Sequence, residues 1–548
     1  MYVNARRCGR KFGTMLSAAD YHAEDMAYQV DTMLNLLKCT VGIEFGSTRI
    51  KAVLIDENCK VLASGGYDWE NKLENGLWTY SYEEIVRGLQ TCYAALKEDI
   101  KQKFGVTAKS FGAIGISAMM HGYIPLDGRD KPLVAFRTWR NNNAESAAEE
   151  LTRLFGYPIP ARWSIAHLYE AVKDGEPHVK DIKKLCTLAV YVHYLLTGRF
   201  CAGIGEASGM FPIDTAEKNY SRRMLESFRA YCGVDAAALL PEVLIAGFEG
   251  GKLTESGALL LDPSGETEAG ILLCPPEGDA GTGMVATNSV KPGTGNISAG
   301  TSVFGMAVLK APLKNVHSGI DLVTTPCGDE VAMVHCNNCS SEINAWVNIF
   351  GEFAKAIGAD ISRNELYKVL FTRSLSGEED CGGAVVCNYL SGENIAGVEK
   401  GVPAAIHTAE CNFTLGNFMR AQLYSAFVTL KLGMDVLTRD ENVKLDKIYA
   451  HGGIFKTEGV CQKFLAAAIN TPVSVLETAG EGGAWGMAVL AACTLKGAEL
   501  EKFLSGTVFV NSAEKVVSPD AACADGFDRY TRNFGKLLSA EKVLSDIL

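Results

Sequence analysis

The sequence predicts an α/β protein of two similar domains that face each other across a central cleft. Its 548 residues, 47% hydrophobic and 21% charged, are enough for two domains with separate cores. Residues 41–56, VGIEFGSTRIKAVLID, read as strand, small-residue turn and strand. Residues 294–309, TGNISAGTSVFGMAVL, repeat this arrangement about 250 residues later. Because ligands favour clefts between domains, we expect a binding site there.

Charge and cysteine content narrow the classes of partner. The net charge of −12 and the pI near 5.4 argue against a broad surface for nucleic acid or anionic membranes, since such surfaces cluster Lys and Arg. The 17 cysteines are scattered, as in reduced cytosolic proteins. The pair Cys336 and Cys339 lacks the second ligand pair of a zinc site. We therefore expect a cytoplasmic protein that binds neither nucleic acid nor membrane.

The first half reads as a mixed layer followed by a helical insert. The apolar spacing from Tyr28 to Leu37 predicts a helical extension over residues 1–38. After the opening strand pair we expect a strand at 62–67, a helix at 82–104, a strand at 113–117 and a hairpin through 126–128. Helical spacing then appears at 144–154, 165–172, 182–196 and 220–231, before a strand at 270–274.

The second half follows the same plan. After residues 294–309 the spacing predicts helices at 341–357, 363–372 and 415–437 and a strand at 447–451. We place the domain boundaries so that 1–38 is the extension, 39–283 the N-terminal domain and 284–548 the C-terminal domain.

The two turns are candidate phosphate sites. Gly46, Ser47 and Thr48 offer backbone N–H groups and hydroxyls, and glycine allows an anion to approach closely. An ordinary hairpin explains this turn equally well. It is neither a Walker loop nor a dinucleotide fingerprint, because a strand follows it directly. Its echo at residues 300–302 is what favours a phosphate site.

Asp279 is the candidate general base. It lies in the glycine-rich segment PPEGDAGTG, directly after a strand, where tight turns can aim its carboxylate into a cleft. The alternative is that Asp279 caps the following helix, because Asp is a favoured N-cap residue. The residues alone leave both interpretations open.

Three further features lie where elements meet. HGGIFK at 451–456 and EGGAWG at 481–486 are glycine clusters that suit either a flat nucleotide base or tight helix packing, the latter especially at Gly486. His121 lies at the carboxyl end of a strand, although a single histidine is more often structural than functional.

Taken together, these motifs resemble the FGGY family of carbohydrate kinases. VGIEFGSTRIKAVLID is similar to its first phosphate motif, NISAGTS to its second, EGDAGTG to its catalytic segment, and AHGGIFK with GEGGAWGMAVLAA to its adenosine region. The resemblance runs in family order from about residue 40 to about residue 495. It implies two actin-like ATPase domains of the ribonuclease H type, with ATP and Mg²⁺ as cofactors, a small-molecule sugar substrate and, as a family habit, a homodimer.

The resemblance also implies roles for individual residues. Asp279 would be the base and a sugar contact, and Glu44 would reach Mg²⁺ through water. The other sugar contacts would be Met120, His121, Trp139 and Asn141. The ATP contacts would be Gly46, Ser47, Thr48, Gly300, Thr301, Ser302, Gly452, Gly453 and Lys456. Glu44 and Asn141 stand where the family usually has Asp, and His167 and Glu170 where it usually has Lys and Trp.

These features predict an ATP-dependent carbohydrate kinase acting on a ketopentose. The segment ISAMMHGYIPLD at 116–127 is most similar to that of xylulose-phosphorylating members, which makes xylulose the first candidate. L-ribulose or another sugar or polyol is the alternative. The alternative of another class is a sugar or nucleotide sensor that keeps the kinase fold without catalysis. The changes at Glu44 and Asn141 favour this alternative. Retention of Asp279 and both turns favours the enzyme.

Overall fold

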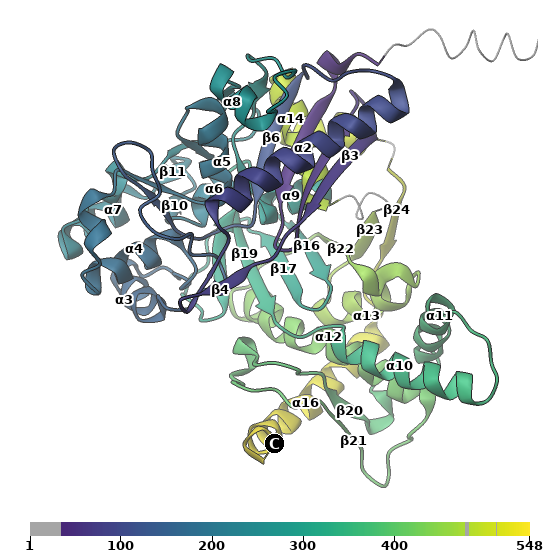
Figure 1. Cartoon of the computed structure of the whole chain (residues 1–548). Helices are drawn as coiled ribbons and strands as arrows, with labels where there is room; N and C mark the ends of the chain where they lie inside the picture. The colour runs from purple at the N-terminus through teal and green to yellow at the C-terminus, as the bar shows by residue number, and fades with distance from the viewer. Residues whose placement is uncertain (1–33, 477–481, 511, 548) are drawn as a thin grey trace, which may run out of the picture.

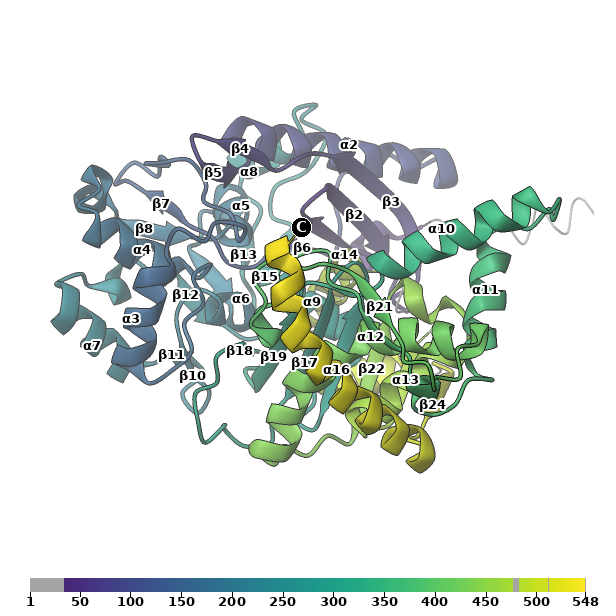
Figure 2. The same ribbon diagram turned by 90° about the horizontal axis from the view of Figure 1, so that it is seen from below.

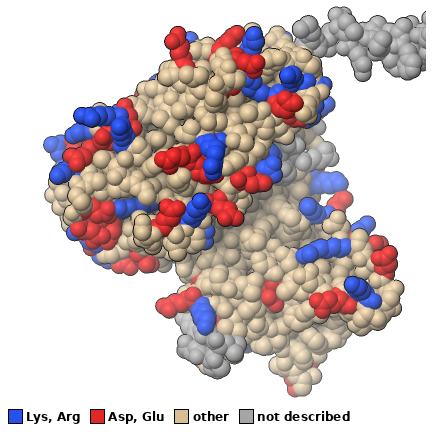
Figure 3. All heavy atoms as spheres, viewed as in Figure 1, with Lys and Arg blue, Asp and Glu red and all other residues tan. Residues whose placement is uncertain are grey.

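The computed structural model describes residues 34–476, 482–510 and 512–547. The chain forms two lobes, each built around one seven-stranded sheet (Figure 1). Of the predicted N-terminal extension, residues 1–33 lie outside the described residues, and a short 3-10 turn spans Leu36–Lys38. In the space-filling view a hollow separates the lobes, and positive and negative side chains are interspersed over the face shown (Figure 3).

The first sheet has the strand order β13-β14-β6-β1-β2-β3, and β15 also pairs with β6. β1 is antiparallel to β2, parallel to β6, and buried along almost its whole length. The strands are β1 (Thr40–Phe45), β2 (Arg49–Ile55), β3 (Val61–Asp68), β6 (Ala113–Ala118), β13 (Gly251–Lys252), β14 (Leu272–Leu273) and β15 (Glu277–Gly278).

The second sheet repeats this plan in the order β18-β19-β17-β16-β22-β23-β24. β16 is antiparallel to β17 and parallel to β22, as β1 is to β2 and β6. The predicted repeat of strand, turn and strand is therefore confirmed as a repeat of sheet pairing. The strands are β16 (Thr294–Ala299), β17 (Val303–Val308), β18 (Ile320–Thr324), β19 (Glu330–Cys336), β22 (Lys447–His451), β23 (Val473–Leu476) and β24 (Glu514–Val517).

Helices cover the first sheet on both faces. α2 (Tyr82–Phe104) packs on β2 and β3, so closely that a Cβ on Gly65 would lie 2.3 Å from the carbonyl oxygen of Cys92. α9 (Asp279–Ala286) and α14 (Gly482–Lys496) pack against each other, and α14 also contacts β1, β2 and β6. α14 follows β23 of the second sheet in sequence but lies on the first sheet, so a single cut at residue 283 does not separate the packing units.

The remaining elements form the insert and the outer parts of the second lobe. Seen from below, α3, α4 and α7 lie at the opposite end of the molecule from α10 and α11 (Figure 2). The insert contains α3 (Glu145–Phe155), α4 (Ser164–Lys173), α5 (Leu188–Thr197), α6 (Ile204–Ser208), α7 (Arg222–Cys232) and α8 (Glu255–Leu261). The second lobe contains α10 (Ser341–Ala356), α11 (Arg363–Ser374), α12 (Leu415–Asp435), α13 (Val460–Ile469) and α16 (Ala521–Ile547). α15 (Leu500–Phe503) packs on α14, and its buried residues join the core of the first lobe. Short strand pairs complete the lobes: β4 (Lys72–Glu74) with β5 (Leu77–Thr79), β7 (Ile124–Leu126) with β8 (Lys184–Cys186), β9 (Cys201–Gly203) with β12 (Glu242–Leu244), β10 (Ile213–Asp214) with β11 (Asn219–Tyr220), and β20 (Val385–Cys387) with β21 (Ala404–Ile406).

Most of the predicted helices are present, and one is corrected. The helix predicted over 182–196 begins only at Leu188, because residues 184–186 form β8, which pairs with β7. The apolar spacing of residues 182–196 is compatible with a helix throughout. The first part nevertheless forms a strand, because it pairs with β7 in the folded chain. Strands β18 and β19 were not predicted. Within the described ranges, none of the helices combines the length and apolarity that a membrane crossing would need.

Candidate active site

The first turn, between β1 and β2, has its carbonyl groups tied back by neighbouring residues. The indole Nε1 of Trp69 donates to the carbonyl oxygen of Gly46 at 2.7 Å, and the Tyr80 hydroxyl donates to that of Ser47 at 2.6 Å. The backbone N–H of Trp69 donates to the carbonyl oxygen of Thr48 at 3.1 Å. Ser47 and Thr48 are exposed. Anchored carbonyls reduce the negative potential that an approaching phosphate would meet, so this turn suits an anion.

The second turn, between β16 and β17, is tied back in the same way. The backbone N–H and the hydroxyl of Ser340 both donate to the carbonyl oxygen of Gly300, at 3.1 and 2.5 Å. The N–H of Cys339 donates to the carbonyl oxygen of Thr301 at 2.9 Å. The hydroxyl of Ser302 donates to the carbonyl of Asn337 at 3.2 Å. Cys336 and Cys339 are buried free thiols, and the loop that contains them supports the turn.

The glycine pair after β22 lies directly beside the second turn. Gly452 has φ of +121°, and a Cβ there would lie 2.0 Å from the carbonyl oxygen of Ala299. Only glycine fits this position, since an L side chain would be strained and would clash. Gly453 and Lys456 are exposed on the short 3-10 turn that follows. Gly452 therefore lies against the end of β16, which leads into the turn at 300–302.

Asp279 is joined directly to the predicted sugar motif. It is the first residue of α9, and its Oδ1 accepts hydrogen bonds from the N–H of Met120 at 3.2 Å and of Ala280 at 2.9 Å. Asp279 is exposed to solvent, and the protein atoms packed around its carboxyl raise its pKa above the ordinary value against the effect of those two bonds. The alternative that Asp279 is only a helix cap does not account for its bond to Met120.

His121 has a strained backbone at the end of β6. Its φ is +71°, which is unusual for a residue other than glycine and is often found at functional sites. Its ring stacks on Trp163, with centroids 6.4 Å apart, and Nδ1 lies 3.3 Å from the carbonyl oxygen of Gly209. Burial and the nearby Arg162 guanidinium hold the pKa of His121 well below its usual range. A neutral imidazole at this position can exchange hydrogen bonds with a hydroxyl ligand.

Trp139 and Asn141 lie on the loop that faces β5. Trp139 is 37% exposed and available to a ligand. Asn141 is buried, and its Oδ1 accepts from the N–H of Trp78 at 2.8 Å. Its Nδ2 donates to the carbonyl oxygens of Trp78 at 2.8 Å and Thr138 at 3.0 Å. The amide therefore fastens this loop to β5, and both of its protons are used. A sugar contact by Asn141 stays a prediction, which these bonds disfavour.

A group of carboxyls surrounds the amino end of α9. Burial, and after it the charge of Asp279, raises the pKa of Glu44 to about 7. Behind Asp279, Glu206 and Glu277 are fully buried. Burial raises the pKa of Glu277 to about 8 and that of Glu206 well above its ordinary value. Burial therefore favours the protonated form of both inner carboxyls, and at Glu206 the charges of Glu277 and Asp279 add to this effect.

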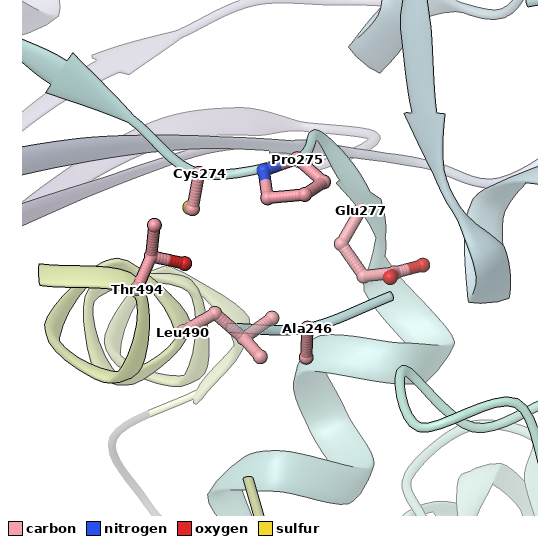
Figure 4. Close-up of a pocket in the computed structure, with 6 residues that line it drawn as sticks. All are labelled: Ala246, Cys274, Pro275, Glu277, Leu490 and Thr494. Atoms are coloured by element: carbon pink, nitrogen blue, oxygen red, sulfur yellow. The ribbon is translucent and has the colours of Figure 1, made fainter. Parts of the chain in front are cut away.

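Glu277 also borders a small cavity beneath the catalytic segment. Figure 4 shows this cavity between α14 and the segment that leads to Asp279. It is lined by Ala246, Cys274, Pro275, Glu277, Leu490 and Thr494. α14 therefore packs against the segment that carries Asp279, the predicted base.

The donor set fits a hydrated Mg²⁺ better than a metal held by protein alone. Over residues 34–476, 482–510 and 512–547 there is no group of three or more His, Cys, Asp or Glu side chains that could hold a metal ion. Two carboxyls, those of Glu44 and Asp279, lie close enough for the charge of one to raise the pKa of the other. Mg²⁺ commonly keeps several waters and binds one or two carboxylates together with substrate phosphates.

Several residues that build this site were not predicted. Trp69 and Tyr80, which anchor the first turn, carry no signal in their local sequence. Glu206 also carries no signal in its local sequence, because only the fold brings it near Asp279. Glu277 lies within the segment EGDAGTG, two residues before Asp279, so its position could have drawn attention.

Comparison with known proteins identifies the family of this chain. Residues 39–262 match the model of the N-terminal domain of the FGGY family of carbohydrate kinases, and residues 295–495 match that of its C-terminal domain. A curated xylulose kinase of Haemophilus influenzae is 23% identical over 468 residues, which cover 81% of this chain and 91% of the relative.

Solved structures agree on the fold. A ligand-bound xylulose kinase and a gluconate kinase, both from Lactobacillus acidophilus, each superpose with a TM-score of 0.74 at 17% identity. Each match covers 92% of this chain, with 98% of the xylulose kinase and 99% of the gluconate kinase. The two TM-scores are equal although the two kinases are named for different substrates. Similarity of fold therefore does not identify the sugar.

The chain belongs to the FGGY family of carbohydrate kinases. It is a sugar kinase with the actin-like ATPase fold, as the sequence predicted, and its small-molecule partners are a sugar and ATP, the phosphate donor of the family.

Proposed function

We propose that this kinase phosphorylates a ketopentose, with xylulose as the first candidate. Support comes from the segment ISAMMHGYIPLD, which ends β6 and carries Met120 and His121. The curated xylulose kinase of Haemophilus influenzae, which spans most of this chain, supports the same choice. L-ribulose is the first alternative, because the loop that carries Asn141 departs from the usual family pattern.

The observation that carries the proposal is the hydrogen bond between the Met120 N–H and Asp279 Oδ1. It holds the carboxyl of Asp279 beside the strand end that carries Met120 and His121, which supports their proposed roles. A sugar seated against Met120 and His121 would present its hydroxyl to this carboxylate. A binding protein without catalysis would have no use for a carboxylate held in this way.

In the proposed reaction Asp279 accepts the proton of the attacking sugar hydroxyl. The sugar oxygen forms a bond to the γ-phosphorus of ATP, the bond from that phosphorus to the bridging oxygen breaks, and ADP leaves with the electron pair. Because Oδ1 already accepts two N–H groups, Oδ2 is the oxygen that takes the proton. The raised pKa of Asp279 makes it a better base than an exposed aspartate.

The two turns would hold the ATP phosphates from opposite lobes. Their anchored carbonyls leave hydroxyls and N–H groups as the donors that a phosphate needs. Mg²⁺, near Asp279 and Glu44, would neutralise phosphate charge that an acidic protein tolerates poorly. Cytoplasmic location and homodimer formation stay predictions.

The test is an ADP-release assay with D-xylulose, L-ribulose, D-ribulose, L-xylulose, glycerol and gluconate, each with ATP and Mg²⁺. We expect the highest kcat/KM with D-xylulose. A higher value with another compound would replace xylulose as the substrate. Binding of a sugar without ADP release from any of the six would overturn the kinase activity and favour a sensor. Asp279→Asn, assayed in parallel, controls for contaminating kinases.

A further inference from the structure

The residues of β1 that face α14 form a continuous docking strip. Side chains alternate between the two faces of a strand, so Thr40, Gly42 and Glu44 lie on one face. The hydroxyl of Thr40 donates to the carbonyl oxygen of Ala488 at 2.9 Å. A Cβ on Gly42 would lie 2.1 Å from the carbonyl oxygen of Ala484, so the helix backbone rests on the strand here. Glu44 is the third residue of this strip.

Glu44 contacts the first turn of α14 with both carboxyl oxygens. Oε2 accepts the N–H of Ala484 at 3.2 Å, across 440 residues of sequence. Oε1 would lie 2.1 Å from a Cβ on Gly483, so glycine is needed there to admit the carboxyl. The first backbone N–H groups of a helix lack partners within the helix, and a side-chain oxygen that accepts one stabilises the helix start.

The length of the side chain matters for this contact. An aspartate, shorter by one methylene, would withdraw its carboxyl by about 1.5 Å. The contact of 3.2 Å would then exceed hydrogen-bond distance. The glutamate at this position, where the family usually has aspartate, thus has a partner that aspartate could not reach.

We propose that Glu44 of β1 is a positioning residue that caps α14, a helix that comes from the other half of the sequence. α14 follows β23 of the second sheet and packs on the first sheet and on α9, whose first residue is Asp279. Through this cap, β1 fixes the start of the helix that supports the catalytic segment. The glutamate therefore holds the two halves of the site in register, and this replaces a metal-orienting role as its main task.

Hydrogen exchange of the protein without Mg²⁺ or ATP tests the cap. Glu44→Gln keeps an oxygen acceptor at the same reach, whereas Glu44→Asp keeps the charge but loses the reach. We expect exchange of the amides at 484–486 to be roughly 5- to 30-fold faster in Glu44→Asp and Glu44→Ala than in the wild type, with Glu44→Gln close to the wild type. Wild-type protection in Glu44→Asp, or loss of protection in Glu44→Gln, would overturn the proposal.

Thr40→Val is the matched control. It removes another hydrogen bond between β1 and the same helix, at Ala488, and should leave exchange at 484–486 unchanged. Faster exchange there in Thr40→Val would mean that α14 responds as a whole, and the specific cap would be rejected. The hydrogen-exchange measurement does not depend on turnover. It therefore tests the cap even if the proposed sugar substrate is wrong.

Kinetics of the same variants separate the cap from a metal role. Because the first turn of α14 lies in the segment predicted to bind adenosine, the cap predicts a higher KM for ATP in Glu44→Asp, with the KM for sugar unchanged. The Mg²⁺ concentration for half-maximal rate should rise less in Glu44→Gln than in Glu44→Asp. The reverse order, with the carboxylate variant least affected, would assign Glu44 to the metal and contradict the cap.

Discussion

The N–H of Met120 donates to Oδ1 of Asp279 at 3.2 Å across 159 residues of sequence. This bond joins the end of β6 to the start of α9, so the residues that would touch the sugar and the residue that would take its proton share one anchor. Movement of either element changes both substrate position and base position.

Asp279→Asn should lower kcat by roughly 10²- to 10⁴-fold, because the amide keeps the bond to Met120 but cannot accept the proton. The KM for ATP should change little. Steady-state kinetics and calorimetric ATP titration measure the two effects. Turnover within a few fold of the wild type would remove Asp279 from the proton transfer.

Tyr80→Phe should raise the KM for ATP several fold, because it releases the carbonyl of Ser47 that the Tyr80 hydroxyl holds at 2.6 Å. Loss of such a bond is worth about 0.5–1.5 kcal/mol. Tyr82→Phe is the control, since its hydroxyl binds the carbonyl of Val134, which the first turn does not include. An equal rise in KM for both variants would refute the anchoring role.

Gly452→Ala should destabilise the second turn, because the new Cβ would meet the carbonyl of Ala299 and the backbone has φ of +121°. We expect a loss of at least about 2 kcal/mol from strain and overpacking. Gly453→Ala has open space around it and should keep its melting temperature. Thermal unfolding compares the two, and equal midpoints would show that the turn adapts.

Glu277→Gln should stabilise the protein at alkaline pH. The pKa of Glu277 is raised from 4.5 to about 8, so its contribution to stability is fully present below pH 4.5 and is lost as the pH rises through about 8. The neutral amide removes this loss. Melting temperatures between pH 5 and 9 should fall less in the variant, and parallel curves would contradict the assignment.

Asn141→Asp, which restores the usual family residue, should lower stability without improving sugar affinity. The amide protons that bind the carbonyls of Trp78 and Thr138 would be replaced by a carboxylate facing those oxygens. A buried acceptor without a donor costs about 1–3 kcal/mol. A tighter KM for sugar with unchanged stability would show instead that residue 141 faces the substrate.

The sequence predicts the repeated plan of the fold well, because each strand, turn and strand is a local pattern. Asp279 and the turn residues could be singled out because they lie in glycine-rich segments, and their roles stay predictions. The partner of Glu44 could not be predicted, since Ala484 lies 440 residues away. The same holds for Tyr80 at the first turn and for the amide bonds of Asn141. In each case a contact made only in the folded chain decides what an ordinary residue does.

The route of α14 has a consequence for how the chain can be divided. Because the helix leaves the second sheet, docks on β1 and is followed by β24, which rejoins the second sheet, the first lobe contains a segment from the second half of the sequence. A fragment ending at residue 283 would expose the strip of Thr40, Gly42 and Glu44 to water. The complementary fragment would leave the apolar surface of α14 uncovered. The lobes should therefore be obtainable only together, by co-expression or as one chain.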